Sequence, residues 1–442
     1  MSLISYSLTP PHTHTAAPKD LESDNSFVAV ANNFTRRGLK KAKKRSLARK
    51  ASVIQVPRSS FGDCDDEEQH LEYVGYIAQY MDHPNIVAKA CTEIDSWSFD
   101  VFKVHKASNG NSLSVVGMAS MLRNNLMDVT PPIMFVEFLA EITKRYRDNP
   151  YHNSIHGADV CQSMHSIMIS GRPFMKRLSH PVRYGALIAA LCHDVGHPGR
   201  NNAFLTKASS IGKPLLLPLP LMSLSSDKSQ ALASIATDIA SIYNDRSPLE
   251  QMHVTVMRNL ARQKECDIFS MISREEQSTV LRLMTEMILG TDMVNHNDNI
   301  AALVRYADTS KKVVKDDHKG GTPQACVDVL PALLHCADVC NPTKPWSLYK
   351  RWTDRIMQEF FDQGDDEQML DVDVMFDKEK IDIPNFQLYF IGGFIRGYFK
   401  ILDKISDFNC KEIMDNMDAN ESRWKEIAGK KKRSDSSSSS SS

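Results

Sequence analysis

The chain has 442 residues, of which 42% are hydrophobic and 24% are charged, and its formal net charge is −1. This is the composition of ordinary globular material, with room for one large domain or two smaller ones plus tails. The balanced charge gives no overall sign of nucleic acid as a partner, so we expect none.

The cysteines and the first residues of the chain indicate the cellular compartment in which the protein is expected. The nine cysteines are odd in number and form no Cys-x-x-Cys pair, which favours buried thiols in a reducing compartment over a disulfide framework. Residues 1–7 lack the charged and apolar regions of a signal peptide. No apolar stretch of about 18 residues could span a bilayer. We therefore expect a cytoplasmic protein without a transmembrane segment.

Residues 1–70 form the first region, which is rich in Ser, Thr, Asn, Pro and charge without an apolar period. We expect it to be a disordered arm. A dense basic run extends over residues 36–50; a solvated tail is the simplest interpretation, with a membrane-surface or nuclear-import role as alternatives. Arg49 and Lys50 precede Ser52 in the pattern that basophilic kinases prefer, so a kinase acting on Ser52 is a candidate partner.

From about residue 71 to 428 the apolar residues recur at helical spacing, which predicts a compact all-α domain of many helices. Helix starts are predicted at residues 130–132 and 179–181, where a proline follows a capping residue. Residues 429–442 are rich in Lys and Ser and are expected to be a disordered low-complexity tail. Two apolar stripes carry the helical prediction: Phe135, Phe138, Leu139 and Ile142, and Val280, Leu283, Met284, Met287 and Ile288.

The segment 211–237 interrupts this pattern. Residues 215–221 are apolar but contain two prolines, which exclude a regular helix. Such an apolar run must either be covered by other residues or form an exposed loop that tends to bind other apolar surfaces.

Two histidine motifs are the main candidates for function. His152 and His156 are four residues apart, which on a helix places them on one face a turn apart. His193 and His197 repeat the spacing, with Asp194 beside the first. Because neutral imidazoles and carboxylates are ligands of divalent metals, the grouped residues favour a metal site over ordinary core histidines.

A third segment, residues 335–342, adds the distant carboxylate of Asp338. The residues before it are apolar, and a buried Asp is costly unless it is paired or binds a metal. The alternative is a helix cap near Pro342. If the three segments converge in space, the sequence predicts a metal hydrolase.

Through these and further motifs, residues 94–428 closely resemble the catalytic domain of the class I 3′,5′-cyclic nucleotide phosphodiesterases, helical members of the His-Asp phosphohydrolase superfamily. The resemblance implies an all-α fold and hydrolysis of cyclic nucleotides to 5′-nucleoside monophosphates. Its motifs are Tyr151-His152-Asn153-x-x-His156, His193-Asp194-x-x-His197-Pro198-Gly199, Tyr243-Asn244-Asp245, Leu249-Glu250, Thr291-Asp292-Met293, His335-x-Ala337-Asp338, and the stretch from Asn341 to Phe361.

By this resemblance, His156, His193, Asp194 and Asp338 bind the tighter of two divalent metal ions, usually zinc. Asp194 also bridges to a second ion, usually magnesium or manganese, as the ligand preferences of these metals allow. A hydroxide that bridges the two ions attacks the phosphorus in line. His152 is then the general acid that protonates the departing O3′.

The resemblance also implies roles around this centre. Four residues would hold metal-bound waters or orient the histidine ligands: His197, Glu250, Thr291 and Asp292. The substrate would be bound by Tyr151, Asn341, Ile356, Gln387 and Phe390. In that set, the Gln387 amide can hydrogen-bond either purine, while Phe390 and Ile356 would face the ring from opposite sides.

The pair Asn341–Pro342 resembles the cAMP-selective branches, so we expect cAMP to be favoured over cGMP. Three departures from the family pattern are expected to leave activity in place. Gly196 stands where many members have Asp, and Met252 replaces a histidine in the usual Leu-Glu-Asn-His-His run. The third, residues 396–398, replaces a common Pro-Leu and is a candidate for altering the rim of the pocket.

Removal of 211–237 would restore the family spacing between Asn202 and Tyr243. The segment is therefore expected to be either a lineage-specific loop or an unspliced intron, and both options stay open. Two other functions are alternatives. One is a His-Asp phosphohydrolase that acts on another phosphate ester, and the other is a catalytically silent nucleotide sensor or scaffold. Among partners, a cyclic nucleotide is expected, and a homodimer is a further option.

Overall fold

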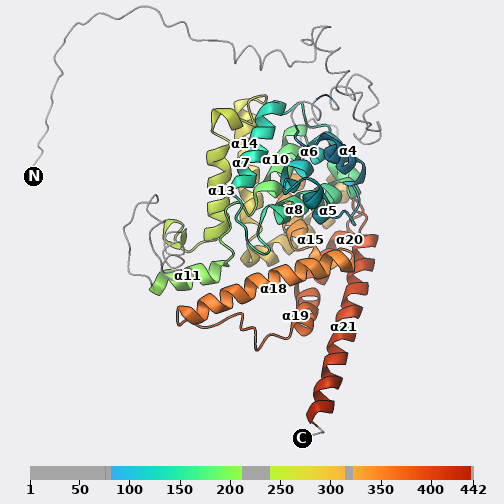
Figure 1. Cartoon of the computed structure of the whole chain (residues 1–442). Helices are drawn as coiled ribbons and strands as arrows, with labels where there is room; N and C mark the ends of the chain where they lie inside the picture. Colours follow the sequence, from blue (N-terminus) through green and yellow to red (C-terminus); the bar gives the residue numbers. More distant parts are fainter. Residues whose placement is uncertain (1–74, 76–80, 212–238, 314–321, 440–442) are drawn as a thin grey trace, which may run out of the picture. The chain divides into compact units, whose positions relative to one another are not determined.

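The computed structural model describes residue 75 and residues 81–211, 239–313 and 322–439 (Figure 1). Within these ranges every regular element is a helix, which confirms the predicted all-α fold. The arm 1–70 with Ser52, and all but the first residue of the segment 211–237, lie outside the described residues.

The elements follow one another as short and medium helices. Those before residue 212 are α4 (Pro84–Glu93), α5 (Val101–Ala107), α6 (Ser112–Arg123), α7 (Pro132–Arg145), α8 (Ser154–Ser170), α9 (Arg172–Met175), α10 (His180–Cys192) and α11 (Asn202–Ile211). Those after residue 238 are α13 (Pro248–Leu260), η4 (Lys264–Cys266), α14 (Arg274–Leu289), η5 (Met293–Asn295), α15 (His296–Val313), α16 (Gln324–Asp328), α17 (Leu330–Asp338), η6 (Asn341–Thr343), α18 (Trp346–Met369), α19 (Ile383–Phe390), the π-helix η7 (Ile391–Ile395), α20 (Arg396–Lys404) and α21 (Lys411–Ser439).

The predicted helix starts and core stripes are confirmed. Helix α7 begins at Pro132 and α10 at His180, each with a proline in its first turn, where its missing N–H costs nothing. The four stripe residues of α7 are fully buried, and those of α14 are at most 5% exposed. The apolar faces of these helices therefore form part of the core, and α14 packs against α10 and α13.

Helix α8 is the central helix of the fold. Fourteen of its 17 residues are buried, and it packs against α6, α10 and α17. Its buried polar side chains have partners, as they must: the Gln162 amide donates to the carbonyls of Ile94 and Ser96, both at 2.8 Å, and His165 Nε2 lies 2.9 Å from Asp95 Oδ1. These contacts fix α8, whose N-terminus carries the first histidine motif.

The C-terminal helix extends further than the sequence predicts. Helix α21 runs from Lys411 to Ser439, so the expected tail from residue 429 starts inside a helix. No proline follows Gly429 to end it.

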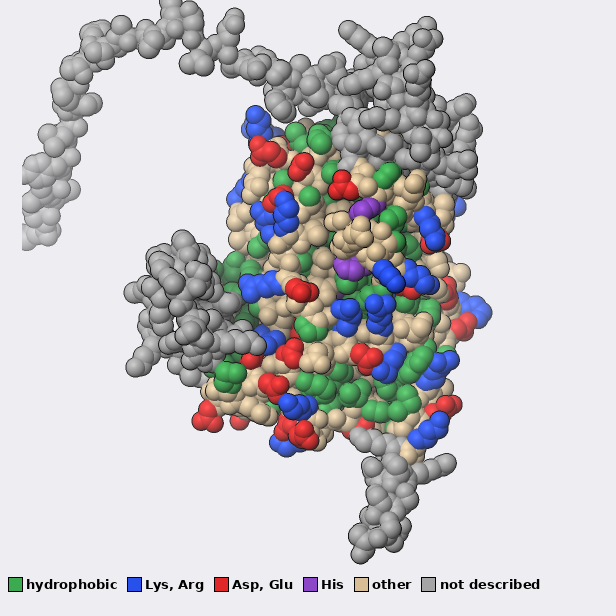
Figure 2. All heavy atoms as spheres, viewed as in Figure 1, with side chains coloured by type: hydrophobic (Ala, Val, Ile, Leu, Met, Phe, Trp, Pro, Cys, Tyr) green, Lys and Arg blue, Asp and Glu red, His purple; other side chains and the backbone are tan. Residues whose placement is uncertain are grey.

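The surface carries charge of both signs. On the face shown in Figure 2, acidic and basic side chains are interspersed, and hydrophobic side chains gather in its lower part. Of the helices that are described, none combines the length and apolar character needed to cross a membrane.

Candidate metal centre and adjoining pocket

The two histidine motifs lie at helix ends rather than along helices, so their predicted placement one turn apart on a helix is wrong. Asn153 caps α8, and its side-chain oxygen accepts from the backbone N–H of Ile155 at 2.9 Å. His152 therefore precedes the helix. His193 follows the last residue of α10, and His197 lies in the turn beyond it.

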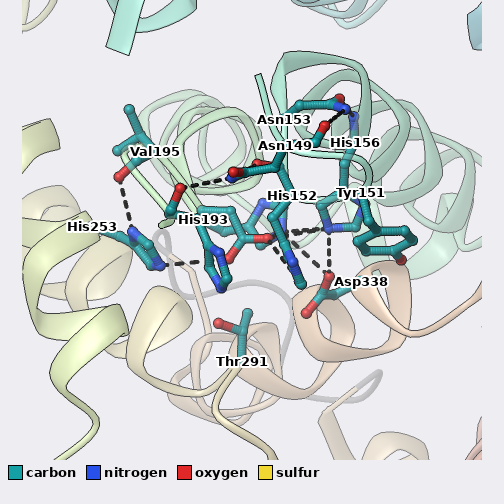
Figure 3. Close-up of polar contacts among 12 residues, drawn as sticks. Asn149, Tyr151, His152, Asn153, His156, His193, Val195, His253, Thr291 and Asp338 are labelled. Carbon is teal, nitrogen blue, oxygen red and sulfur yellow. Dashed lines mark hydrogen bonds and ion pairs between the residues drawn. The ribbon is translucent and has the colours of Figure 1, made fainter. Parts of the chain in front are cut away.

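Asn149 links the two motifs. Its side-chain amide donates to the carbonyls of His152 and His197, both at 2.8 Å (Figure 3). Gly199 has φ +74°, and a Cβ there would lie 2.9 Å from the Asn149 side-chain oxygen. A glycine is needed because both the backbone conformation and the close approach exclude a side chain.

Four ligand atoms meet where the N-terminus of α8 approaches the C-termini of α10 and α17 (Figure 3). His156 Nε2 lies 3.1 Å from Asp338 Oδ1 and 3.3 Å from Asp194 Oδ2. His193 Nε2 lies 3.1 Å from Asp194 Oδ2 and 3.3 Å from Asp338 Oδ1. The two Nε2 atoms are 3.2 Å apart.

These spacings fit a metal ion. With bonds of about 2.0–2.2 Å, neighbouring ligand atoms around one ion lie about 2.8–3.6 Å apart in tetrahedral or octahedral geometry. Residues from three segments far apart in the sequence thus form the convergent set expected from the motifs.

The protonation states also suit a metal. His193 Nδ1 lies 2.9 Å from the Ala190 carbonyl, which can only accept, so Nδ1 carries a proton and Nε2 is the nitrogen that faces the carboxylates. Burial opposes the imidazolium, but Asp194 and Asp338 raise the pKa of His193 well above its ordinary value, so a metal ion would take the place of the proton on Nε2. Burial opposes ionisation of Asp194 and Asp338, but His193 and His156 hold the pKa of both carboxyls below the ordinary value. Both carboxylates are therefore available as anionic ligands.

A second group of possible ligands adjoins the first. Asp194, His197 and His253 bring one donor atom each within 4.8 Å of one another. His253 Nδ1 lies 2.9 Å from the Val195 carbonyl, and burial lowers the pKa of its ring to about 4. Its Nε2 is 3.6 Å from Asp194 Oδ1 and has no hydrogen-bond partner within the described residues. An orphaned buried nitrogen beside a carboxylate fits a second ion or its waters.

His152 is held by a residue that the sequence analysis did not assign. Its Nδ1 is paired with Glu359 on α18. The other oxygen of Glu359 accepts from the backbone N–H groups of Tyr151 and His152 at 2.9 and 3.0 Å. Burial disfavours the imidazolium, but the Glu359 carboxylate outweighs it and raises the pKa of His152 to about 9. The opposite face of the ring stacks on His197, with centroids 3.9 Å apart.

The predicted supporting acids are linked by Asn202 of α11. Its amide donates to Glu250 at 2.9 Å and to Asp292 at 3.4 Å, and its oxygen accepts from the backbone N–H of Leu249 at 3.1 Å. Burial, with the nearby Asp292 charge, raises the pKa of Glu250 to about 8. The buried Thr291 hydroxyl donates to the Ile288 carbonyl at 2.8 Å.

One cavity of about 530 Å³ adjoins the metal cluster, a size typical of small-molecule sites. Of the 14 predicted site residues, 12 line it, and His156 and His193 are buried behind it. The wall also includes Tyr349, whose hydroxyl donates to Gln387 Oε1 at 2.7 Å. The amide of Asn341 donates to the Tyr151 hydroxyl.

One departure from the family pattern does not reach this cavity. Residues 396–398 are absent from its lining. Arg396 instead pairs with Asp418 and Glu421 on α21, and the buried Tyr398 hydroxyl donates to the Ala332 carbonyl. The prediction that residues 396–398 alter the rim of the pocket is therefore wrong. Their side chains instead connect α20 to α21 and α17.

The other two departures are neighbours. A Cβ on Gly196 would lie 3.8 Å from Cε of Met252. The two positions at which the chain departs from the expected Asp and His therefore contact each other.

This contact predicts non-additive effects. Gly196→Asp alone should destabilise by about 1–3 kcal/mol, because Gly196 has φ +85°, which strains any side chain, and because a partly buried carboxylate would then face a thioether methyl. Adding Met252→His should recover about 0.5–3 kcal/mol through a new ion pair. Denaturant unfolding of the two single variants and the double variant measures this interaction energy. Strict additivity would contradict it.

The fold and the site define a helical protein in which a cluster of metal-ligating side chains adjoins a pocket of small-molecule size. The family model of the 3′,5′-cyclic nucleotide phosphodiesterases matches residues 151–213 and 230–417. The chain belongs to this family. The gap between the two matched stretches, residues 214–229, falls within the segment 211–237, whose origin as a loop or an intron stays a prediction.

Individual relatives agree with this assignment. The chain is 30% identical over 334 residues to a Drosophila melanogaster protein named 3′,5′-cyclic-AMP phosphodiesterase, isoform F, covering 74% of this chain and 46% of that protein. It is 30% identical over 394 residues to rat 3′,5′-cyclic-AMP phosphodiesterase 4C, covering 87% and 63%. The chain thus spans about half to two thirds of the length of these two relatives.

A solved structure supports the fold. The structure described as LmjPDEB1 in complex with IBMX matches with a TM-score of 0.64 at 24% identity, covering 76% of this chain and 93% of that one.

Proposed function

We propose that this protein hydrolyses 3′,5′-cyclic nucleotides to 5′-nucleoside monophosphates, with cAMP favoured over cGMP. One observation carries the proposal: a single cavity joins the cluster of metal-ligating side chains and His152 to Gln387, Phe390 and Ile356. A cyclic nucleotide needs both parts, because the phosphodiester reacts while the purine positions it.

The four-residue set is proposed to hold zinc, and Asp194 with waters a magnesium or manganese ion. When bound, such ions supply an activated water and offset the charge on the phosphate oxygens. His156 and His193 contribute Nε2, while Asp194 and Asp338 contribute carboxylate oxygens. His197, Thr291, Glu250 and Asp292 are proposed to hold the metal waters.

His152 is proposed to be the general acid. Its Nδ1 is engaged by Glu359, so the Nε2–H is the proton that it can deliver. That nitrogen lies 4.0 Å from Asp194 Oδ2, at the edge of the metal cluster. The raised pKa keeps the imidazole protonated at neutral pH, as protonation of the leaving O3′ requires.

Purine binding is assigned to Gln387, Phe390 and Ile356, with Tyr151 and Asn341 on the adjoining wall. The Tyr349 hydroxyl donates to Oε1 of Gln387, which leaves Nε2 free to donate to the base. An amide fixed in one orientation serves one purine better than the other. The relatives named as cyclic-AMP phosphodiesterases support adenine as that purine.

Tyr349→Phe should weaken this selectivity. Loss of one hydrogen bond, worth about 0.5–1.5 kcal/mol, frees the Gln387 amide to rotate. The ratio of kcat/KM for cAMP to that for cGMP should then fall about 2–10-fold, while metal content stays unchanged. Competing-substrate assays measure the ratio. An unaltered ratio would show that Tyr349 does not set the choice of purine.

The decisive test is a hydrolysis assay of the purified full chain with cAMP and cGMP, with and without removal of metals by a chelator. We expect 5′-AMP as the main product, loss of activity on chelation and recovery with zinc and magnesium. A non-cyclic phosphate diester serves as the competing substrate. Preference for that ester over both cyclic nucleotides would favour a different phosphohydrolase.

The remaining expectations are proposals of the same kind. All eight cysteines in the described ranges are buried and free, which supports a reducing, cytoplasmic setting. Phosphorylation of Ser52 and formation of a homodimer stay predictions.

A further inference from the structure

A second pocket, of about 460 Å³ and open to solvent, is lined by Arg258 of α13 and by residues of α14, and it shares no residue with the first. It is called the α13–α14 cavity below. The two helices pack against each other (Figure 1). The lining residues are Arg258, Arg274, Gln277, Ser278, Leu281, Arg282 and Thr285. Three of these seven are arginines and none is acidic.

The charges of these three arginines are not offset by acidic partners in the described part of the chain. Within the described residues, no ion pair between any of them and a carboxylate is found. Arg258 is partly buried, and its Nη1 donates to the Thr285 hydroxyl at 3.3 Å, while Arg274 and Arg282 are exposed. Glu276, in the first turn of α14, is engaged by Ser273 in a capping box.

The other polar side chains of the wall differ in whether they are free to bind a ligand. The Gln277 amide donates to the carbonyls of Phe269 and Ile272 at 2.9 and 3.2 Å, so it is already occupied. Ser278 adds a hydroxyl group to the wall, whereas the Thr285 hydroxyl already donates to the Leu281 carbonyl at 2.7 Å. The donors that a ligand could use are therefore those of the arginines and Ser278, and no carboxylate lines the wall.

Such a wall matches one ligand chemistry. Guanidinium groups bind phosphate oxygens through paired N–H donors, and three of them around one pocket give it a positive potential that attracts anions. The volume is in the range of small-molecule sites. We propose that the α13–α14 cavity binds a polyanion that carries phosphate groups, either as a free solute or as a lipid headgroup.

Two probes of this chemistry test the proposal on the purified full chain. Inositol 1,4,5-trisphosphate is titrated calorimetrically as the solute. Phosphatidylcholine vesicles with and without phosphatidylinositol 4,5-bisphosphate test the headgroup by flotation. We expect binding that weakens with salt. Arg274→Gln and Arg282→Gln should each weaken it about tenfold, and the triple variant with Arg258→Gln should abolish it.

Arg305→Gln, at an exposed arginine on α15, is the matched control and should bind as the parent does. Binding of both probes would show that a free solute is an acceptable ligand. Binding to the vesicles alone would show that the ligand is a lipid headgroup. Equal binding by the parent and the triple variant would place the anion elsewhere, the metal centre included, and overturn the proposal. Failure of the parent to bind either probe would also overturn it. The single variants decide the question if the triple variant does not fold.

Discussion

Asp338→Ala is expected to abolish metal binding and hydrolysis together. Asp338 supplies one of four atoms that lie 3.1–3.3 Å from their neighbours, and its removal leaves two histidines and one carboxylate. Loss of a residue that only supports a ligand costs about 10–100-fold in metal affinity, so loss of the ligand itself should cost more than about 100-fold.

Metal content after gel filtration, measured by mass spectrometry, tests this result independently of activity. Asp338→Asn preserves the shape of the side chain and should still lose most of the metal, because the anionic oxygen is gone. Asp308→Asn, at an exposed position on α15, is the control and should keep both metal and activity. Full metal content in Asp338→Ala would contradict the site.

The local signals in the sequence explain which parts of the fold were predictable. The stripe on α7 and the prolines that open α7 and α10 depend on neighbouring residues alone, and both are found as expected. The residue types of the histidine motifs and Asp338 pointed to a metal site, but only the resemblance to the family picked out His156, His193, Asp194 and Asp338 as its ligands, with Asp338 182 residues from His156.

Contacts set by tertiary packing were not predictable in the same way. Glu359 bonds to His152 across 207 residues, and Tyr349 meets Gln387 across 38. The only signal was that Tyr349, Ile356 and Glu359 recur at helical spacing on α18, which indicates a shared face but not its partner. The placement of His152 outside α8 depends on the Asn153 cap, which competes with continuation of the helix.

His152→Ala is expected to slow turnover by about 10²–10⁴-fold while metal content stays at the parent level. The imidazole is not one of the four converging ligands, and its Nδ1 is occupied by Glu359. The loss should appear in kcat rather than in KM, because the missing proton matters at the leaving group. Loss of zinc from this variant would instead make His152 a ligand.

Glu359→Gln tests the same assignment through pH. Burial alone would lower the pKa of His152, and it is the Glu359 carboxylate that raises it. The acid works only while protonated, so activity falls as pH rises through this pKa. Removing the negative charge lowers the pKa, and the alkaline limb of the kcat profile should move to lower pH by about one to two units. Asp354→Asn, at an exposed acid on the same helix, should leave the limb in place. A limb that is unmoved by Glu359→Gln would mean that another group delivers the proton.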